Sequence, residues 1–419
     1  MGRAQALERV LGSGTGLVRL RVFDGSEAGP ADAPVRVDIR SPRALAYVVT
    51  GRGDLGLARA YVTGEIAVDG DLYTALAHFK RLDLEVSLVA RLRLLKDLGG
   101  VRLLRRPPRP AQEVRLRGRR HSKTRDARAI AHHYDVSNLF YSWILGPSMA
   151  YTCAVYPTAD ASLEEAQFGK HDLVARKLAL KPGMRLLDVG CGWGGMVIHA
   201  AREYGVRTLG VTLSRQQAEW AQKAIAEAGL GELAEVRHLD YRDVVESDFD
   251  AVSSIGLTEH IGLSHLPQYF RFLHDKLRPG GRLLNHCITL PRNEDTVRRG
   301  WFISRYVFPD GELTGVGRLA SVMQDTGFEV RHEENLREHY ARTTAAWSAN
   351  LDAHWDEAVA EVGIGTARVW HLYLAGVSLA FEQNQIQLHQ ILGAKPHADG
   401  RSGMPLRPTW ETPPAEAHR

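Results

Sequence analysis

Cysteine is scarce in this chain of 419 residues, and long apolar runs are missing. The three cysteines, Cys153, Cys191 and Cys287, are too few and too scattered for a disulfide framework or a zinc site. No run of 18 apolar residues occurs, which argues against a transmembrane helix. The first residues, MGRAQALERVLGSGTG, lack the apolar core and cleavage site of a secretory signal. These absences predict a cytoplasmic protein with no bound metal ion.

Charge is distributed unevenly along the sequence. The net charge is +4, but residues 91–128 carry 14 Lys and Arg against three acidic residues, which gives +11 for this segment. The rest of the chain is therefore near −7. The sequence thus joins one basic segment to an acidic body.

The pattern of elements divides the chain into three parts. Residues 1–120 read as a smaller α+β domain, in which VRVDIRSPRALAYVVTG (35–51) predicts a strand and a short helix. RRPPRP (105–110) interrupts any helix and indicates a linker. Residues 121–395 form the second domain, and residues 396–419 are rich in proline and polar residues, which predicts a loose tail.

Strands alternate with helices through the second domain. We expect helices at 194–204 and 215–228, and strands at 184–189, 208–212, 234–239, 251–256 and 282–290. This order predicts an α/β fold with a doubly wound, Rossmann-like parallel sheet.

A glycine-rich turn follows the first of these strands, in LLDVGCGWGG (186–195). Glycines at such a turn let the backbone approach a ligand closely, as in nucleotide-binding folds. Asp188 precedes the first glycine, where it can accept a hydrogen bond from the amino-acid side of the ligand. The next strand ends in GVTLS, without the acidic residue that holds an NAD ribose. These features favour S-adenosylmethionine (SAM) over NAD, with a bare strand–helix turn as the structural alternative.

An acidic residue ends another apolar strand, in AVSSIGLTEHIG (251–262). Glu259 lies just past the carboxyl end of this strand, where open α/β sheets bind their ligands. We interpret it as a site residue, with a helix cap as the alternative. His260 is interpreted as structural.

Eight separated motifs resemble those of the cyclopropane-fatty-acyl-phospholipid synthases. In chain order they are HHYDVSNLFYSWIL, MAYTCAVYP, LLDVGCGWGG, GVTLSRQQ, LDYRD, EHIG, YVFPDGEL and IQLHQ. The resemblance covers residues 121–395 and implies a class I SAM-dependent methyltransferase that alkylates the double bond of acyl chains. Residues 1–120 resemble, more weakly, the smaller domain of full-length bacterial members.

Within this family the sequence most resembles the actinobacterial branch that makes 10-methylene fatty acids, precursors of 10-methylstearic (tuberculostearic) acid. SSIGLTEHIG and LLNHCITL carry this likeness. Thr258 stands where cyclopropane-forming members usually have an aromatic residue, and Asn285 where they usually have an apolar or small one. A cyclopropane product is the alternative.

The resemblance also implies site residues, each carried over by motif. SAM contacts, besides Asp188, would fall on Tyr151, Thr152, Gly190, Gly192, Thr212, Leu213, Gln217, Tyr241 and Arg242. A bicarbonate site would fall on Cys153, Glu259, His286, Ile288 and Tyr340, with Cys153 and Ile288 acting through backbone groups.

The chemistry explains why a base is needed. Methylation of an alkene leaves a carbocation, and a proton must then be lost in a pocket from which water is excluded. A bare carboxylate in such a pocket tends to be protonated. We therefore expect Glu259, His286 and Tyr340 to hold bicarbonate as the base.

Several of these residues have plainer interpretations. Cys153 is not expected to act as a nucleophile, because nothing nearby indicates a lowered pKa. His286 could be a core histidine, and Tyr340 could simply pack a helix. Six aromatic residues are expected mostly in the core, although some could face the sulfonium and the cation: Tyr134, Phe140, Tyr141, Trp193, Tyr306 and Phe308.

The expected substrate lies in a bilayer, and the basic segment could bind the enzyme to the membrane surface. Residues 88–106 space Leu and Val among Arg as an interfacial helix does, which predicts peripheral binding to phospholipids at the inner membrane face. A solvated or interdomain helix is the alternative. Nucleic-acid binding is disfavoured because no recognisable module accompanies the charge.

Other functions and partners follow from the same considerations. A separate reductase would complete the methyl-branched acid, since this chain shows no second nucleotide loop. A homo-oligomer is compatible with the sequence. The rival functions are a catalytically silent lipid-binding or scaffold protein and a nicotinamide-dependent oxidoreductase.

Overall fold

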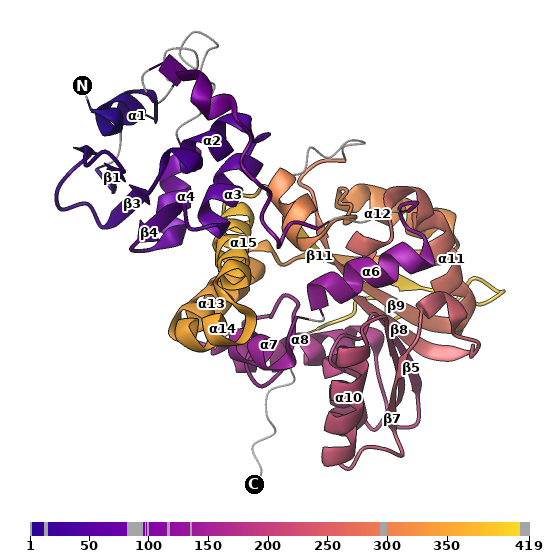
Figure 1. Ribbon diagram of the computed structural model, residues 1–419. Helices are drawn as coiled ribbons and strands as arrows, with labels where there is room; N and C mark the ends of the chain where they lie inside the picture. Colours follow the sequence, from indigo (N-terminus) through magenta and orange to yellow (C-terminus); the bar gives the residue numbers. More distant parts are fainter. Residues whose placement is uncertain are drawn as a thin grey trace. The chain divides into compact units, whose positions relative to one another are not determined.

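The computed structural model describes residues 2–11, 16–81, 95–96, 98, 100–114, 118–134, 136–293 and 300–410. The chain forms two compact units (Figure 1). The first contains residues 1–116, 298–309 and 344–380, and the second contains residues 117–297, 310–343 and 381–419. No helix in the described part of the chain is both long and apolar enough to cross a bilayer.

The first unit is built on a four-stranded sheet in the order β2-β1-β3-β4. Its strands are β1 (Val18–Val22), β2 (Glu27–Ala28), β3 (Val35–Ile39) and β4 (Ile66–Asp69). Its N-terminal helices are α1 (Arg3–Leu11), α2 (Pro42–Thr50), α3 (Leu55–Val62), α4 (Leu72–Arg81) and the 3-10 helix η1 (Gly100–Leu104). Ser41 caps α2 by accepting a hydrogen bond from Arg43 N, and Pro42 fits the first turn. The strand and helix expected in 35–51 are confirmed.

A seven-stranded sheet forms the centre of the second unit, in the order β10-β11-β9-β8-β5-β6-β7. The strands are β5 (Arg185–Val189), β6 (Arg207–Thr212), β7 (Ala234–His238), β8 (Phe249–Ile255), β9 (Leu277–Thr289), β10 (Glu329–Asn335) and β11 (Gln387–Ala394). β5 to β9 are parallel, which confirms the doubly wound prediction. β10 and β11 add an antiparallel edge that the sequence analysis missed.

Helices cover both faces of this sheet (Figure 1). Apolar residues of α8 (Leu163–Leu178), α9 (Gly195–Tyr204) and α10 (Arg215–Glu227) pack on one face. Those of α11 (Leu266–Lys276) and α12 (Val316–Asp325) pack on the other. The remaining elements are α6 (Lys123–Tyr134), α7 (Asn138–Leu145), η2 (Tyr241–Asp243), η3 (Thr258–His260) and η4 (Leu263–His265).

The first unit also takes residues from the region expected to be a continuous catalytic domain. These lie in η5 (Ile303–Val307) and α14 (Trp355–Val362), and in parts of α13 (Arg337–Ala353) and α15 (Ile364–Glu382). Ala375 packs with Tyr61 and Leu72, and Tyr61 Oη lies 2.8 Å from His371 Nδ1. These long-range contacts explain why a single boundary near residue 120 does not describe the structure.

Two other expectations need comment. Within the expected tail, Met404 and Trp410 are partly buried against the core that contains Leu178 and Leu392. Residues 411–419 lie outside the described residues. Of the interfacial helix expected at 88–106, residues 88–94, 97 and 99 lie outside the described residues, and the described part includes η1.

Candidate active site

The glycine-rich turn connects β5 to α9 at the carboxyl end of the parallel strands. Gly190 and Gly192 have φ values of +74° and +56°, a conformation that L side chains rarely adopt. The Gly190 and Cys191 amides both donate to Val211 O of β6, at 2.9 and 3.0 Å. A Cβ on Gly190 would also lie 3.1 Å from the Leu257 side chain. The turn therefore needs glycine for its shape and for the space it leaves.

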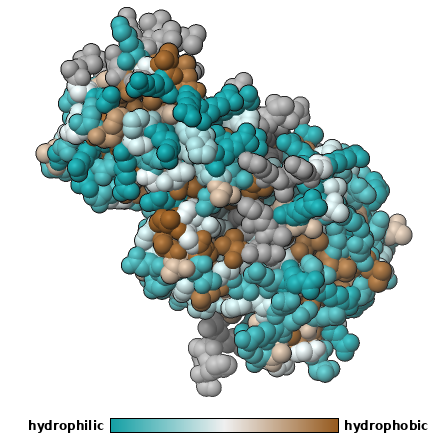
Figure 2. Space-filling view, viewed as in Figure 1, coloured by the Kyte–Doolittle hydropathy of each residue, from teal (hydrophilic) through white to brown (hydrophobic). Residues whose placement is uncertain are grey.

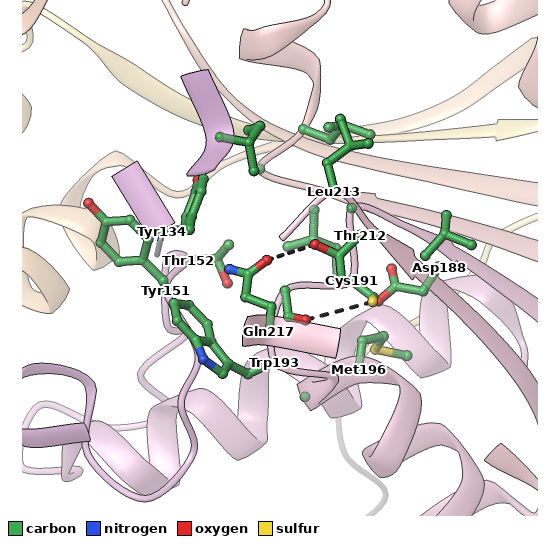
Figure 3. A pocket seen from close by; sticks show the side chains of 18 of the residues that line it. Tyr134, Tyr151, Thr152, Asp188, Cys191, Trp193, Met196, Thr212, Leu213 and Gln217 are labelled. Atoms are coloured by element: carbon green, nitrogen blue, oxygen red, sulfur yellow. Dashed lines mark hydrogen bonds between the residues drawn. The ribbon is translucent and has the colours of Figure 1, made fainter. Parts of the chain in front are cut away.

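A pocket opens at this turn within the second unit (Figure 3). All ten residues predicted to contact SAM line it: Tyr151, Thr152, Asp188, Gly190, Gly192, Thr212, Leu213, Gln217, Tyr241 and Arg242. In Figure 3, Tyr134, Tyr151 and Trp193 lie on one side, opposite Asp188 and Leu213. The structure thus gathers residues that are 91 positions apart, from Tyr151 to Arg242, around one cavity.

Short hydrogen bonds hold two sides of the pocket. Thr212 Oγ1 donates to Gln217 Oε1 at 2.7 Å, which connects the end of β6 to the first turn of α10 (Figure 3). Arg242 pairs with Asp240 at 2.6 Å and with Asp126 of α6 at 3.1 Å. The second pair ties α6 to η2, and Asp126 and Arg242 both line the pocket.

Asp188 and Lys170 are two buried titratable groups in the pocket wall. Asp188 is 2% exposed, and its Oδ1 accepts a hydrogen bond from Ser253 Oγ at 2.6 Å. Burial raises the pKa of Asp188 to about 7, although Ser253 and Lys170 oppose the rise. Burial likewise lowers the pKa of Lys170 to about 7, against the attraction of Asp188. A small change in surroundings can therefore change the charge of either group.

Sequence reasoning missed Lys170. Its Nζ donates to Thr152 Oγ1 at 3.0 Å and lies 2.7 Å from His171 Nε2. The signal was present, because Lys170 and Lys177 stand seven residues apart on the face of α8 that also buries Leu173 and Val174. Buried lysines are rare and usually have a partner or a function.

Glu259 lies in η3, directly after β8 and two residues beyond Leu257 of the pocket wall. Its Oε1 accepts a hydrogen bond from Ile288 N of β9 at 2.6 Å. The Glu259 carboxyl therefore binds a neighbouring strand and does not cap its own segment, so the capping alternative is wrong. Among the described residues its buried Oε2 has no hydrogen-bond partner. Burial raises the pKa of Glu259 to about 7.

His286 lies on β9 two residues before Ile288, so both occupy the same face of the sheet. It is fully buried, and its Nδ1 lies 3.2 Å from Gln390 Nε2. Its Nε2 has no hydrogen-bond partner within the described part of the chain. Burial, with the charges of Lys170 and Lys177, holds the pKa of His286 well below its usual range. The ring is therefore neutral at physiological pH.

Cys153 and Tyr340 lie close to one backbone carbonyl, that of Leu336. Cys153 Sγ lies 3.8 Å from Leu336 O, which also accepts the Tyr340 amide at 3.1 Å. Complete burial raises the pKa of Cys153 well above its usual value, which opposes a thiolate nucleophile. The Tyr340 ring stacks on Phe381, with 4.4 Å between centroids. The charge of Lys170 lowers the pKa of both Cys153 and His286, although burial is the larger cause for each.

Thr258 and Asn285 bind each other. Thr258 Oγ1 donates to Asn285 Oδ1 at 2.5 Å, and Asn285 Nδ2 lies 3.2 Å from Cys287 Sγ. Asn285 and Cys287 share the face of β9 that α11 covers, opposite the face of His286. This pair therefore connects η3 to β9 next to Glu259.

The aromatic residues divide between pocket and core. Tyr134 and Trp193 line the pocket, with their ring centroids 6.2 Å apart. Phe140 and Tyr141 are fully buried, and Tyr141 packs on Trp193 at 4.8 Å. Tyr306 and Phe308 belong to the first unit. His260 lines the pocket, which the structural interpretation of that residue did not anticipate.

Comparisons with known proteins agree with this geometry. The family model described as mycolic acid cyclopropane synthetase matches residues 121–391. A probable fatty acid methyltransferase of Mycobacterium tuberculosis is 53% identical over 98% of this chain and 99% of its own length. The cyclopropane-fatty-acyl-phospholipid synthase of Escherichia coli (strain K12) is 32% identical, with 88% of this chain and 90% of that protein covered.

A solved structure of a cyclopropane synthase has a similar fold. The mycolic acid cyclopropane synthase CmaA1, in a complex with SAH and CTAB, superposes with a TM-score of 0.61 at 32% identity. The match covers 64% of this chain and 97% of that one. With the glycine turn and its pocket, these similarities show that the chain belongs to the mycolic acid cyclopropane synthetase family and is an SAM-dependent lipid methyltransferase.

Proposed function

We propose that this enzyme methylates the double bond of an unsaturated, oleoyl-type acyl chain of a phospholipid, and that the product is a 10-methylene acyl chain on the route to 10-methylstearic acid. A bound bicarbonate supplies the base. The observation that carries the proposal is the pair of buried polar atoms, Glu259 Oε2 and His286 Nε2, for which the described residues offer no partner.

The pocket residues fit SAM in shape and chemistry. Glycines at positive φ leave the backbone at the β5–α9 turn open to a ligand. Asp188 supplies a carboxyl group for the amino-acid end, while Tyr134, Tyr151 and Trp193 offer ring faces to a sulfonium.

The residues around Glu259 fit a small planar anion. Buried polar atoms almost always have a partner, so an atom without one among the described residues leaves room for a ligand or water as its partner. Glu259 with its pKa near 7 can present a protonated oxygen, and His286 is neutral. Such groups donate hydrogen bonds to an oxyanion without adding negative charge.

These side chains have a defined task in the reaction. A new carbon–carbon bond would form as the alkene takes the methyl group of SAM. The methyl–sulfur bond would break, which leaves SAH and a cation on the neighbouring carbon. A hydride shift then moves the cation to the methyl-bearing carbon, and loss of a proton from the new methyl gives the methylene group. Glu259, His286 and Tyr340 orient the base toward that proton, and water must be kept from the cation, which it would quench.

The methylene product rests on Thr258 and Asn285. Their hydrogen bond fixes η3 against β9 and thereby sets where the Glu259 carboxyl lies. An aromatic residue at 258 and an apolar one at 285 could not form this bond. We propose that the position of the base relative to the cation decides the product. With the Thr258–Asn285 bond in place, the proton is lost without ring closure; without the bond, the base lies elsewhere and ring closure is favoured.

Access to phospholipid would come from the basic surface of the first unit. Val101 and Leu104 of η1 are 81% and 55% exposed, next to the exposed side chains of Arg102, Arg105 and Arg106. Figure 2 shows hydrophobic side chains among hydrophilic ones at the top of the view, over the part of the first unit that carries η1. Apolar residues flanked by arginines suit the headgroup region of an anionic membrane.

The test is product analysis with the full-length enzyme. Incubation with SAM and oleoyl phospholipid vesicles, with and without bicarbonate, is followed by mass spectrometry and proton NMR of the released fatty acids. We expect a gain of one CH2 unit, vinylidene protons and a rate that falls when bicarbonate is removed. High-field ring protons would establish the cyclopropane alternative instead, and no gain in mass would contradict both.

A further inference from the structure

We propose that Lys177 and Gln390 are positioning residues that fix the tautomer of His286, so that Nε2 carries the ring proton and donates it in a hydrogen bond to the bound anion. The tautomer follows from the contacts around His286. Its use for anion binding rests on the function proposed above.

The groups that act on His286 are aligned across three adjacent strands. Glu334 of β10 pairs with Gln390 of β11, which pairs with His286 of β9. Directly paired residues of antiparallel strands project to the same face, so these three side chains form one row. Lys177 of α8, whose side chain is fully buried, reaches Glu334 and Gln390 over this row.

The direction of each hydrogen bond follows from Lys177. Lys177 Nζ donates to Gln390 Oε1 at 2.7 Å and pairs with the Glu334 carboxylate. Burial lowers the pKa of Lys177 from its usual value, and the Glu334 carboxylate opposes that fall and so favours the charged form. An ammonium group has donors and no acceptor, so it must face the amide oxygen of Gln390. The amide nitrogen of Gln390 is left to face His286 Nδ1 at 3.2 Å.

This arrangement leaves one tautomer for His286. The Gln390 amide nitrogen is a donor only, so His286 Nδ1 must be the acceptor and the ring proton must be on Nε2. The opposite tautomer would place two N–H groups against each other in a fully buried site, with Gln390 and His286 both at 0% exposure.

Because His286 is neutral, its tautomer decides whether Nε2 is a hydrogen-bond donor or an acceptor. Its surroundings hold Lys170, His171 and Lys177 of α8, with Glu334 of β10 reached through Lys177. Burial and the two lysine charges hold its pKa well below the usual range. A neutral imidazole has a single N–H, so fixing it on Nε2 determines whether the free end of the ring donates or accepts. An oxyanion needs a donor there.

Nitrogen NMR of the ring measures the tautomer directly. In the full-length enzyme labelled with 15N-histidine, long-range proton–nitrogen spectra distinguish protonated from unprotonated ring nitrogens, and His286→Asn identifies the signals. We expect Nε2 to be protonated and Nδ1 to be unprotonated, without substrate, at neutral pH. A proton on Nδ1 would overturn the inference whatever the activity, and this measurement needs no altered network.

Gln390→Glu tests the consequence for the anion. The introduced carboxylate cannot donate to Nδ1, so the proton should move to Nδ1 and the donor at Nε2 should be lost. We expect the apparent affinity for bicarbonate to fall roughly tenfold to hundredfold, the usual loss for a hydrogen bond to a charged group, with the affinity for SAM unchanged. Because a carboxylate raises the pKa of a neighbouring histidine, binding should recover as pH falls and Nε2 is protonated again.

A matched control is available on α10. Gln222 Nε2 donates to Val236 O at 2.8 Å, so Gln222→Glu makes the same chemical change away from His286. It should leave both the bicarbonate dependence and the pH profile unaltered. If Gln390→Glu folds and behaves like this control, Gln390 is a packing residue and the inference fails. If Nε2 is protonated but turnover is independent of bicarbonate, the proposed base fails while the tautomer assignment stands.

Discussion

Individual residues at this site owe their properties mainly to burial. Glu259, Asp188 and Lys170 all have a pKa near 7, and burial is the largest cause in each case. None of the three therefore has a fixed charge at neutral pH, unlike the same residue types at a surface. That property suits the proposed reaction, in which a proton is released beside a cation.

Glu259→Gln tests whether the Glu259 carboxyl takes part in proton loss. The amide keeps the size of the side chain and can still accept from Ile288 N, but it cannot share a proton with the base. We expect turnover to fall at least about a hundredfold, as when a catalytic acid–base group is lost, with SAM affinity within about twofold. Equilibrium binding and methyl-transfer assays measure the two effects.

The control for that substitution is Glu227→Gln, at a largely exposed glutamate on α10. It should leave turnover and SAM binding unaltered. Full activity in Glu259→Gln would show that the base lies elsewhere.

Glu259 should also make stability depend on pH. Its pKa is about 7 in the folded chain against a usual 4.5, so the folded state holds the proton more tightly than the unfolded state. The stability contributed by this proton is complete below about pH 4.5 and is lost as pH rises through about 7. The wild-type chain should therefore lose up to about 3 kcal/mol of unfolding free energy over this range relative to Glu259→Gln. Urea unfolding of both proteins at pH 5 and pH 8 measures the difference, and parallel changes in the two would contradict it.

At the scale of elements, strand register brings the site together. Glu259 follows β8, Ile288 lies on β9 and Gln390 on β11, so residues up to 131 positions apart meet at one end of one sheet. β5 to β9 were predictable because each has apolar residues in a run or in alternation, next to a glycine turn or a helix. β10 was not, because EVRHEEN has no buried residue and no apolar alternation, and it forms a strand only by pairing with β11.

A double-mutant cycle can measure the strength of the Thr258–Asn285 hydrogen bond that joins η3 to β9. Thr258→Val leaves Asn285 Oδ1 buried without its donor, which should cost about 1–3 kcal/mol of unfolding free energy. Asn285→Leu alone should cost a similar amount, and the double variant less than the sum, because no polar atom is then left alone. Urea unfolding of the four proteins gives the coupling.

The same four proteins test the role of this link in the product. Each variant should shift the ratio of vinylidene to ring protons toward the ring, since the Glu259 carboxyl is no longer held by η3 in its present position. Thr208→Val is the control, a buried threonine of β6 that donates to Val197 O at 3.3 Å. It should lower stability without changing the ratio, and an unaltered ratio in all four proteins would separate the Thr258–Asn285 bond from product choice.

At the scale of the whole molecule, we assign methyl transfer to the second unit and membrane binding to the first. The second unit holds the pocket and the sheet, and the first carries η1 with its exposed apolar and basic side chains. Their segments are interleaved in sequence, which the sequence analysis did not predict. The reason is that α15 buries Ala375 against Tyr61 and Leu72, and such apolar contacts between distant segments leave no local pattern in the sequence.

Charge removal on η1 tests the membrane role. Arg102→Gln, Arg105→Gln and Arg106→Gln together should weaken binding to anionic vesicles about a hundredfold, since each arginine near a membrane surface contributes about 1 kcal/mol. Vesicle sedimentation measures this, and added salt should weaken wild-type binding more than binding of the triple variant. Glutamine at Arg202, Arg207 and Arg215, three exposed arginines of the second unit, is the matched control. Equal losses in both triple variants would mean that net charge, and not η1, governs binding.

The sequence by itself determined the parallel sheet and the glycine turn, because short apolar runs, glycines and their spacing act locally and leave a readable pattern. The ten predicted SAM contacts came from motifs shared with the synthase family, and all ten line the pocket. Only the tertiary structure decided which atoms meet. It paired Glu259 with Ile288, buried Lys170 beside Thr152, and aligned Glu334, Gln390 and His286 across three strands. Such contacts depend on strand register and burial, which arise from packing between distant segments and have no counterpart in the order of residues.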